Sequence, residues 1–149
     1  MIAALYTALS YLTQYFQVAF FQIRVSEALC VMPLFFPEAV PALFVGCILS
    51  NLLSACLPID TVFGSIATLI GALGALMLAK IPEKYKWLAT LPTILANAAI
   101  IPPILIFAYG STDSYPFLLM TVFIGELVSA GVLGTLLYYS LKKTKRFDL

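Results

Sequence analysis

Charge is scarce in this sequence, and histidine is absent. Of the 149 residues, 8 are Lys or Arg and 7 are Asp or Glu, whereas 62% are hydrophobic and the mean hydropathy is +1.05. The lack of histidine excludes a Ser-His-Asp triad and a zinc site with histidine ligands. A net charge of +1 excludes a basic surface for nucleic acid. Because a soluble domain of this size has no interior for so many apolar side chains, the composition indicates an integral membrane protein.

Cysteine is also scarce, and its spacing does not match the common metal motifs. Cys30, Cys47 and Cys56 lie inside apolar stretches, are odd in number and form no CxxC pair. We interpret them as small core residues. We therefore expect no metal site, no disulfide and no cofactor.

Long stretches without charge divide the chain into six predicted helices. The stretches 1–23, 39–59, 61–79 and 87–112 contain no charged residue, and each is close to the roughly 20 residues that cross a bilayer. The sequence predicts an all-α membrane protein with six transmembrane helices and a short second helix. These helices are expected at about 2–21, 25–36, 38–57, 61–79, 87–108 and 116–141. Because no linker separates two domains, we expect residues 1–149 to form a single integral membrane domain.

Basic residues predict the orientation of this bundle. Seven of the eight Lys and Arg side chains follow the fourth and sixth predicted helices: Lys80, Lys84, Lys86, Lys142, Lys143, Lys145 and Arg146. Loops rich in these residues face the cytoplasm. Six helices then place both termini in the cytoplasm of a multi-pass protein in the cell membrane.

Polar residues inside the apolar helices indicate a binding site. An ionised side chain within a transmembrane helix costs about 2.5–3.5 kcal/mol, so Glu126 needs a compensating role. Counting about 1.5 Å per residue along each helix places five polar side chains from four helices at similar depth in the membrane. These are Arg24, Glu27, Asn51, Asn97 and Glu126. We predict a cavity that opens to the outside and binds a planar nitrogen heterocycle through carboxylates, amides and aromatic surfaces.

Each of these residues also has a structural interpretation. Arg24 and Glu27 can neutralise each other at i,i+3 spacing, and Glu126 can be a neutral carboxyl that is hydrogen-bonded to a neighbouring helix. Asp60 can cap the fourth helix instead of contacting a ligand. Phe63 is one of several aromatic residues near the predicted cavity, and most aromatic residues of such a chain face lipid.

Two alanines mark a smooth strip on the first helix. Ala4 and Ala8 are four residues apart, which is the small-xxx-small spacing that lets another helix approach closely. Similar strips occur in the fourth and sixth helices, so this spacing alone does not identify an external partner.

Three stretches of the chain match the motifs of a known family: Gln22-Ile23-Arg24-Val25-Ser26-Glu27-Ala28-Leu29, Asn51-Leu52-Leu53, and Asp60-Thr61-Val62-Phe63-Gly64-Ser65. They resemble those of the QueT family, the substrate-binding membrane subunits of energy-coupling factor transporters for queuosine precursors. The resemblance implies capture of a 7-deazaguanine, such as 7-aminomethyl-7-deazaguanine or queuine. The ligand-binding residues are then expected to be Gln22, Arg24, Glu27, Asn51, Asp60, Phe63, Asn97 and Glu126.

The resemblance also implies partners. In this family the smooth face of the first helix contacts a membrane coupling subunit, and this face corresponds here to Ala4 and Ala8. Two cytoplasmic ATPases supply the energy, and the chain has no GxxxxGK[ST] motif of its own. We expect a transport subunit that is not an enzyme and does not bind nucleic acid.

Three other functions remain open from the sequence. The first is a binding subunit for another flat heterocycle, such as the vitamin thiamine. The second is a solitary secondary carrier or channel, in which Arg24 and Glu126 relay protons or ions. The third is an intramembrane enzyme, which the lack of histidine and of a paired nucleophile and base disfavours.

Overall fold

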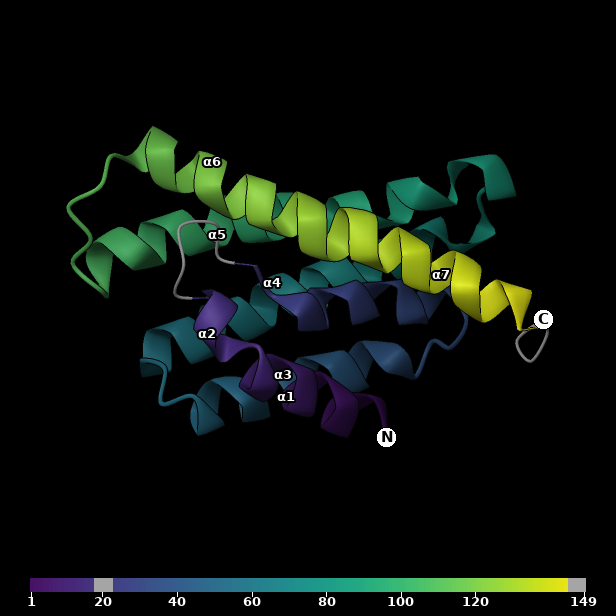
Figure 1. Ribbon diagram of the computed structural model, residues 1–149, viewed down its shortest axis with the longest axis horizontal. Helices are drawn as coiled ribbons and strands as arrows, with labels where there is room; N and C mark the ends of the chain where they lie inside the picture. Colours follow the sequence, from purple (N-terminus) through teal and green to yellow (C-terminus); the bar gives the residue numbers. More distant parts are fainter. Residues whose placement is uncertain (18–22, 145–149) are drawn as a thin grey trace.

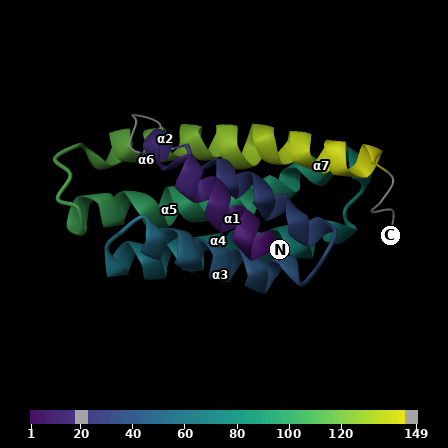
Figure 2. The same ribbon diagram turned by 60° about the horizontal axis from the view of Figure 1, so that its bottom comes forward.

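The computed structural model describes residues 1–17 and 23–144. Within these residues every regular element is a helix, and the helices lie side by side along the long axis of the molecule (Figure 1). Six apolar helical segments pass back and forth along this axis, and the same arrangement is visible after rotation (Figure 2). The expectation of an all-α architecture is confirmed for the described part of the chain.

Three helical segments are long and apolar enough to cross a membrane: Pro58–Lys80, Glu83–Phe107 and Tyr115–Lys143. The first consists of α4 (Pro58–Met77) and η2 (Leu78–Lys80), and the second of η3 (Glu83–Thr90) and α5 (Leu91–Phe107). The third consists of α6 (Tyr115–Glu126), the π-helix η4 (Leu127–Leu133) and α7 (Gly134–Lys143). These segments correspond to the last three predicted helices.

The first three helices differ from the predicted ranges. In place of one helix that starts at residue 2, α1 covers Ile2–Leu12 and α2 covers Gln14–Gln17, and the predicted residues 18–21 lie outside the described part of the chain. Helix α3 covers Ala39–Leu53 and ends four residues before the predicted position 57. Ala55 has a φ of 52°, a left-handed conformation that a helix cannot continue through, so the chain turns here before Pro58 begins α4.

The short second helix is η1 (Val25–Leu34), a 3₁₀-helix in the centre of the bundle. At about 2.0 Å per residue, its ten residues rise about 20 Å, which is less than a membrane core. It packs against α1, α4, α7 and η4. Its residues Leu29 and Cys30 join the largest buried cluster together with side chains of α1, α3 and α4.

Small residues let α1 and α5 approach their neighbours closely. A Cβ atom on Gly46 of α3 would lie 3.0 Å from both the Ala3 carbonyl oxygen and the Tyr6 Cβ of α1. A Cβ atom on Gly71 of α4 would lie 2.5 Å from Oγ1 and 2.7 Å from Cα of Thr93 in α5. These contacts fix the positions of two helices that carry polar site residues.

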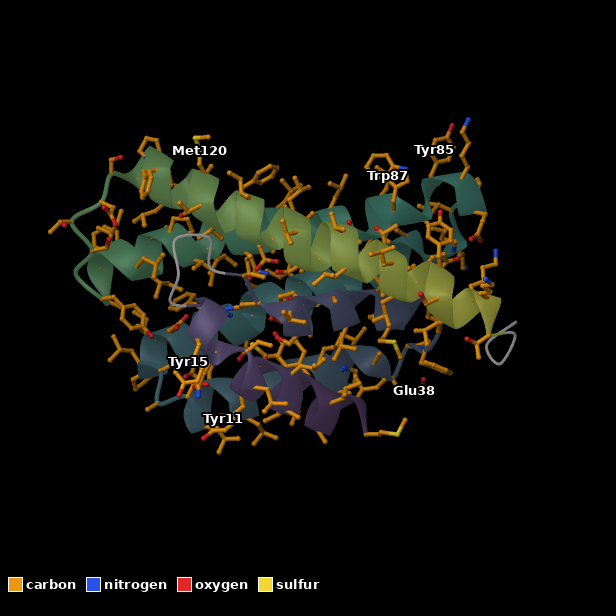
Figure 3. The ribbon with its side chains drawn as sticks, in the orientation of Figure 1. Tyr11, Tyr15, Glu38, Tyr85, Trp87 and Met120 are labelled. Carbon is orange, nitrogen blue, oxygen red and sulfur yellow. The ribbon has the colours of Figure 1, made fainter. Side chains whose placement is uncertain are left out.

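The two ends of the bundle differ in chemistry. At one end, Lys142 of α7 forms a 2.9 Å ion pair with Glu83 of η3, which also accepts a hydrogen bond from the Tyr138 hydroxyl. We call this the basic end, because it also contains Lys84 and Lys86 of η3, Lys143 of α7 and Lys80 of η2, which contacts η3. The labelled side chains of Tyr85 and Trp87 lie toward this end, and Tyr15 lies toward the other (Figure 3).

Candidate functional site

A cavity of about 500 Å³ opens at the end of the bundle opposite the basic end. It lies among α2, the turn after α3, the start of α4 and the last turns of α5. Its lining residues are Gln14, Tyr15, Arg24, Ser54, Ala55, Cys56, Asp60, Ile101, Leu105 and Tyr109. The volume is within the usual range for small-molecule sites. The mixture of aromatic, apolar and charged residues is also typical of such sites.

Three polar side chains meet around Gly64 of α4 beside this cavity. A Cβ atom on Gly64 would lie 3.4 Å from Asn51 Nδ2, 3.5 Å from Asp60 Oδ1 and 3.8 Å from Arg24 Nη1. The glycine therefore leaves the space into which the three side chains project. The structure brings together the cation that precedes η1, a carboxylate of α4 and an amide of α3.

Tyr109 holds Asp60 at the mouth of the cavity. Its hydroxyl donates a 2.8 Å hydrogen bond to Asp60 Oδ2 and accepts one of 3.3 Å from the backbone N–H of Leu57. Desolvation and the adjacent carboxylate raise the pKa of Tyr109 above its usual range, so the hydroxyl stays protonated and able to donate. The bond ties the turn after α5 to the first turn of α4.

Glu27 lies deeper and is fully buried. Its Oε1 accepts hydrogen bonds from Tyr6 of α1, at 2.5 Å, and from Thr68 of α4, at 3.3 Å. Its Oε2 accepts a 3.0 Å hydrogen bond from the Cys30 thiol. Three donors from three elements thus surround this carboxylate and fix its orientation.

A second buried group contains polar atoms without partners. Among the described residues, Thr93 Oγ1, both terminal atoms of Asn97 and Glu126 Oε2 are buried and have no hydrogen-bond partner. The exposed fractions of these side chains are 0%, 0% and 2%. Asn97 and Glu27 lie close to Glu126, and Thr93 lies beside Cys30. Buried polar groups are nearly always satisfied in proteins, so this group has the character of a binding surface.

Asn97 connects the two levels of the site. It lies one helical turn from Ile101 and two turns from Leu105, both of which line the cavity. Thr93 lies one turn further toward the basic end. The unpartnered atoms therefore lie beneath the cavity rather than along its walls.

The structure places the predicted residues unequally. Arg24, Glu27, Asn51, Asp60, Asn97 and Glu126 all lie in or beneath the cavity region, whereas Gln22 lies outside the described residues. Phe63 departs from the expectation: its side chain is 45% exposed and lines an outward-facing apolar groove with Ile59, Ile100 and Phe107. The physical reason is helical phase, since Asp60 and Gly64 share the inward face of α4 and Phe63 lies beside that face.

Four residues around the two buried glutamates were not predicted from the sequence. Tyr6, Cys30 and Thr68 contact Glu27, and Thr93 belongs to the unpartnered group. One signal for Thr93 was present, because it precedes Asn97 by four residues and must share its helix face. Ala4 and Ala8 lie on the exposed face of α1, away from the site.

Within residues 1–17 and 23–144, no group of three or more Cys, Asp or Glu side chains is arranged to hold a metal ion.

Comparison with known proteins gives one match. The model of a family described as QueT transporter matches residues 1–143, which is nearly the whole chain. No curated protein and no solved structure matches.

Proposed function

The chain belongs to the QueT transporter family, and from this premise we propose that it captures a queuosine precursor outside the cell as the substrate-binding subunit of an energy-coupling factor transporter. The ligand is a 7-deazaguanine, such as 7-aminomethyl-7-deazaguanine or queuine. The protein is a membrane protein of a transport family.

One observation carries the proposal of ligand capture. A cavity of about 500 Å³ at one end of an apolar bundle lies above buried, unpartnered polar atoms of Thr93, Asn97 and Glu126. Leaving a buried polar group unpaired costs about 1–3 kcal/mol, so a bundle that served only as a scaffold has no reason to bury them. A polar heterocycle that enters from the cavity supplies their partners.

The orientation follows from the basic end. Loops rich in Lys face the cytoplasm, so the cavity opens to the outside. With six crossings of the cell membrane, both termini lie on its cytoplasmic side.

The transport step requires partners. Helix α1 presents Ala4, Leu5 and Ala8 on its exposed face, a smooth strip onto which a membrane coupling subunit packs. The chain carries no nucleotide-binding motif, so two cytoplasmic ATPases supply the energy through that subunit. After capture, the loaded subunit reorients in the membrane to release its ligand inside.

A panel of ligands tests this function. Thermal unfolding of the detergent-purified protein is measured with 7-deazaguanines, ordinary purines and thiamine. A ligand that binds only the folded state at 100 times its Kd adds about 2.7 kcal/mol of stability. We expect stabilisation by 7-deazaguanines and none by adenine. Stabilisation by thiamine alone contradicts the ligand assignment, and uptake into vesicles that contain only this protein contradicts the need for ATPases.

A further inference from the structure

We infer that Thr93, Asn97 and Glu126 form hydrogen bonds with the polar edge of the ligand's pyrimidine ring, while the substituent at ring carbon 7 lies in the outer cavity. This inference rests on the proposed function and deepens it. It adds Thr93 to the site, assigns Glu27 a positioning role and predicts which parts of the ligand are selected.

The chemistry of the three side chains matches one edge of a 7-deazaguanine. That edge presents a ring N–H and an exocyclic amine, which are donors, next to a carbonyl oxygen, which is an acceptor. A carboxylate accepts two parallel N–H bonds, as Glu126 Oε1 and Oε2 can do. The Asn97 amide and the Thr93 hydroxyl both donate and accept, so they serve the carbonyl and the adjacent ring nitrogen.

The contrast between the two buried glutamates supports this assignment. Glu27 receives three hydrogen bonds from Tyr6, Thr68 and Cys30. By contrast, Glu126 Oε2 has no partner among the residues that the structure describes. Glu27 therefore keeps its place without a ligand and lies close to Glu126. Glu126 is therefore the carboxylate that can still accept hydrogen bonds from a ligand.

The two-level geometry then fixes the orientation of the ligand. The unpartnered atoms lie beneath the cavity on α5 and α6, and the cavity extends outward past Ile101 and Leu105 to Asp60 and Arg24. A ring whose pyrimidine edge points inward directs its 7-substituent toward this larger, partly polar space. Asp60 offers an acceptor to an amine carried by that substituent. Changes to the polar edge of the ring should therefore lower the affinity strongly, whereas changes to the 7-substituent should have little effect.

Thr93→Val separates a binding role from a structural one. Because the Thr93 hydroxyl is buried without a hydrogen-bond partner, replacing it with a methyl group should leave the unfolding temperature of the ligand-free protein unchanged or higher. Affinity for the ligand should fall about tenfold, as expected when a hydrogen bond to the ligand is lost. Thr90→Val is the matched control, since Thr90 is also buried but donates to the Trp87 carbonyl oxygen. It should bind the ligand as the wild type does.

The ligand series tests the same assignment from the other side. Binding is titrated with 7-aminomethyl-7-deazaguanine, with queuine and with 7-deazaadenine, which lacks the carbonyl and ring N–H of the guanine edge. We expect the wild type to bind the first two within about tenfold of each other and to bind 7-deazaadenine at least about a hundredfold more weakly.

The outcomes distinguish the two proposals. If none of the 7-deazaguanines binds the wild type, the proposed function itself fails. If the wild type binds them but Thr93→Val, Asn97→Leu and Glu126→Gln bind equally well, only the assignment of the ring edge is overturned. A Thr93→Val protein that loses stability while its affinity is unchanged also overturns it, because the hydroxyl is then structural.

Discussion

The Tyr6 hydroxyl donates a 2.5 Å hydrogen bond to Oε1 of Glu27, and both side chains are almost completely buried. The bond joins α1 to η1 in the middle of the bundle. On the opposite side of the same helix, Ala4 and Ala8 are exposed. Helix α1 therefore lies between the polar interior of the site and the surface proposed for the coupling subunit, so its position can respond to both.

Removing the Tyr6 hydroxyl should destabilise the protein. In Tyr6→Phe, Glu27 Oε1 keeps only the longer 3.3 Å hydrogen bond from Thr68. The loss of a donor to a buried charged group should lower the free energy of unfolding by about 1–3 kcal/mol. Thermal unfolding in detergent measures this change. Tyr11→Phe is the control, because Tyr11 lies on the same helix but is 49% exposed and should tolerate the change. Equal stability of the two variants would show that the Tyr6 bond contributes nothing.

A methyl group on Gly71 should disrupt the packing of α4 against α5. The new Cβ would lie 2.7 Å from Cα of Thr93, a backbone atom that cannot move away without shifting the helix. We expect Gly71→Ala to cost about 1–3 kcal/mol of stability and to weaken ligand binding, since Thr93 belongs to the site. Gly131→Ala should be nearly neutral, because its Cβ would meet only side-chain atoms at 3.5 Å or more. Unfolding temperatures of the two variants provide the comparison. A stable Gly71→Ala protein with unchanged binding would contradict this packing.

Thiol labelling should report ligand in the cavity. Cys56 lines the cavity and is partly exposed, whereas Cys30 and Cys47 are buried, at 2% and 0% exposure. Desolvation and the Asp60 charge raise the pKa of Cys56, so its reaction with a maleimide should accelerate as the pH rises above about 8.5. A saturating 7-deazaguanine should slow the labelling several-fold. Cys56→Ser should abolish the fast labelling and serves as the control.

The result would count against a ligand in this cavity if the labelling rate of Cys56 were the same with and without a ligand that stabilises the protein.

A large side chain on the exposed face of α1 should reduce uptake without changing ligand affinity. Ala8→Trp places a large side chain on the proposed contact with the coupling subunit, where only small residues allow close approach. We expect ligand affinity in detergent to be unchanged and uptake by cells that contain the complete transporter to fall at least about tenfold. Leu136→Trp is the control, because Leu136 is 59% exposed on α7 and should face lipid. Equal loss of uptake in both variants would contradict a specific interface on α1.

Much of the fold could be predicted from the distribution of charge. The apolar stretches that end at Lys80, Asp113 and Lys142 correspond to the three long helical segments, because a single ionised residue rarely stays within a membrane span. The short second helix was also predictable, because the apolar run between Glu27 and Glu38 is too short to span a membrane. Its 3₁₀ geometry was not, and neither was the π-helix over Leu127–Leu133, since both depend on packing against each other in the bundle.

Of the candidate site, the sequence predicted best the ionisable residues that lie in apolar segments. Glu27 and Glu126 are conspicuous because ionisable residues in apolar helices are rare. Thr68 and Thr93 are small, uncharged and common in such helices, so their roles depend on contacts between helices that no local pattern encodes. Phe63 could not be placed in this way, because it lies three positions after Asp60 at the edge of the buried face of α4, and its side chain lines an outward-facing groove.

Capture of a 7-deazaguanine is tested most directly by calorimetric titration of the detergent-purified protein with 7-aminomethyl-7-deazaguanine. We expect saturable binding of one ligand per chain and at least about tenfold weaker binding by Glu126→Gln, because the carboxamide nitrogen is a donor and cannot accept the second of two parallel N–H bonds. The protein should show no ATP hydrolysis alone or with the ligand. Absence of saturable binding by a folded protein, or binding that Glu126→Gln leaves unchanged, would contradict capture at this site.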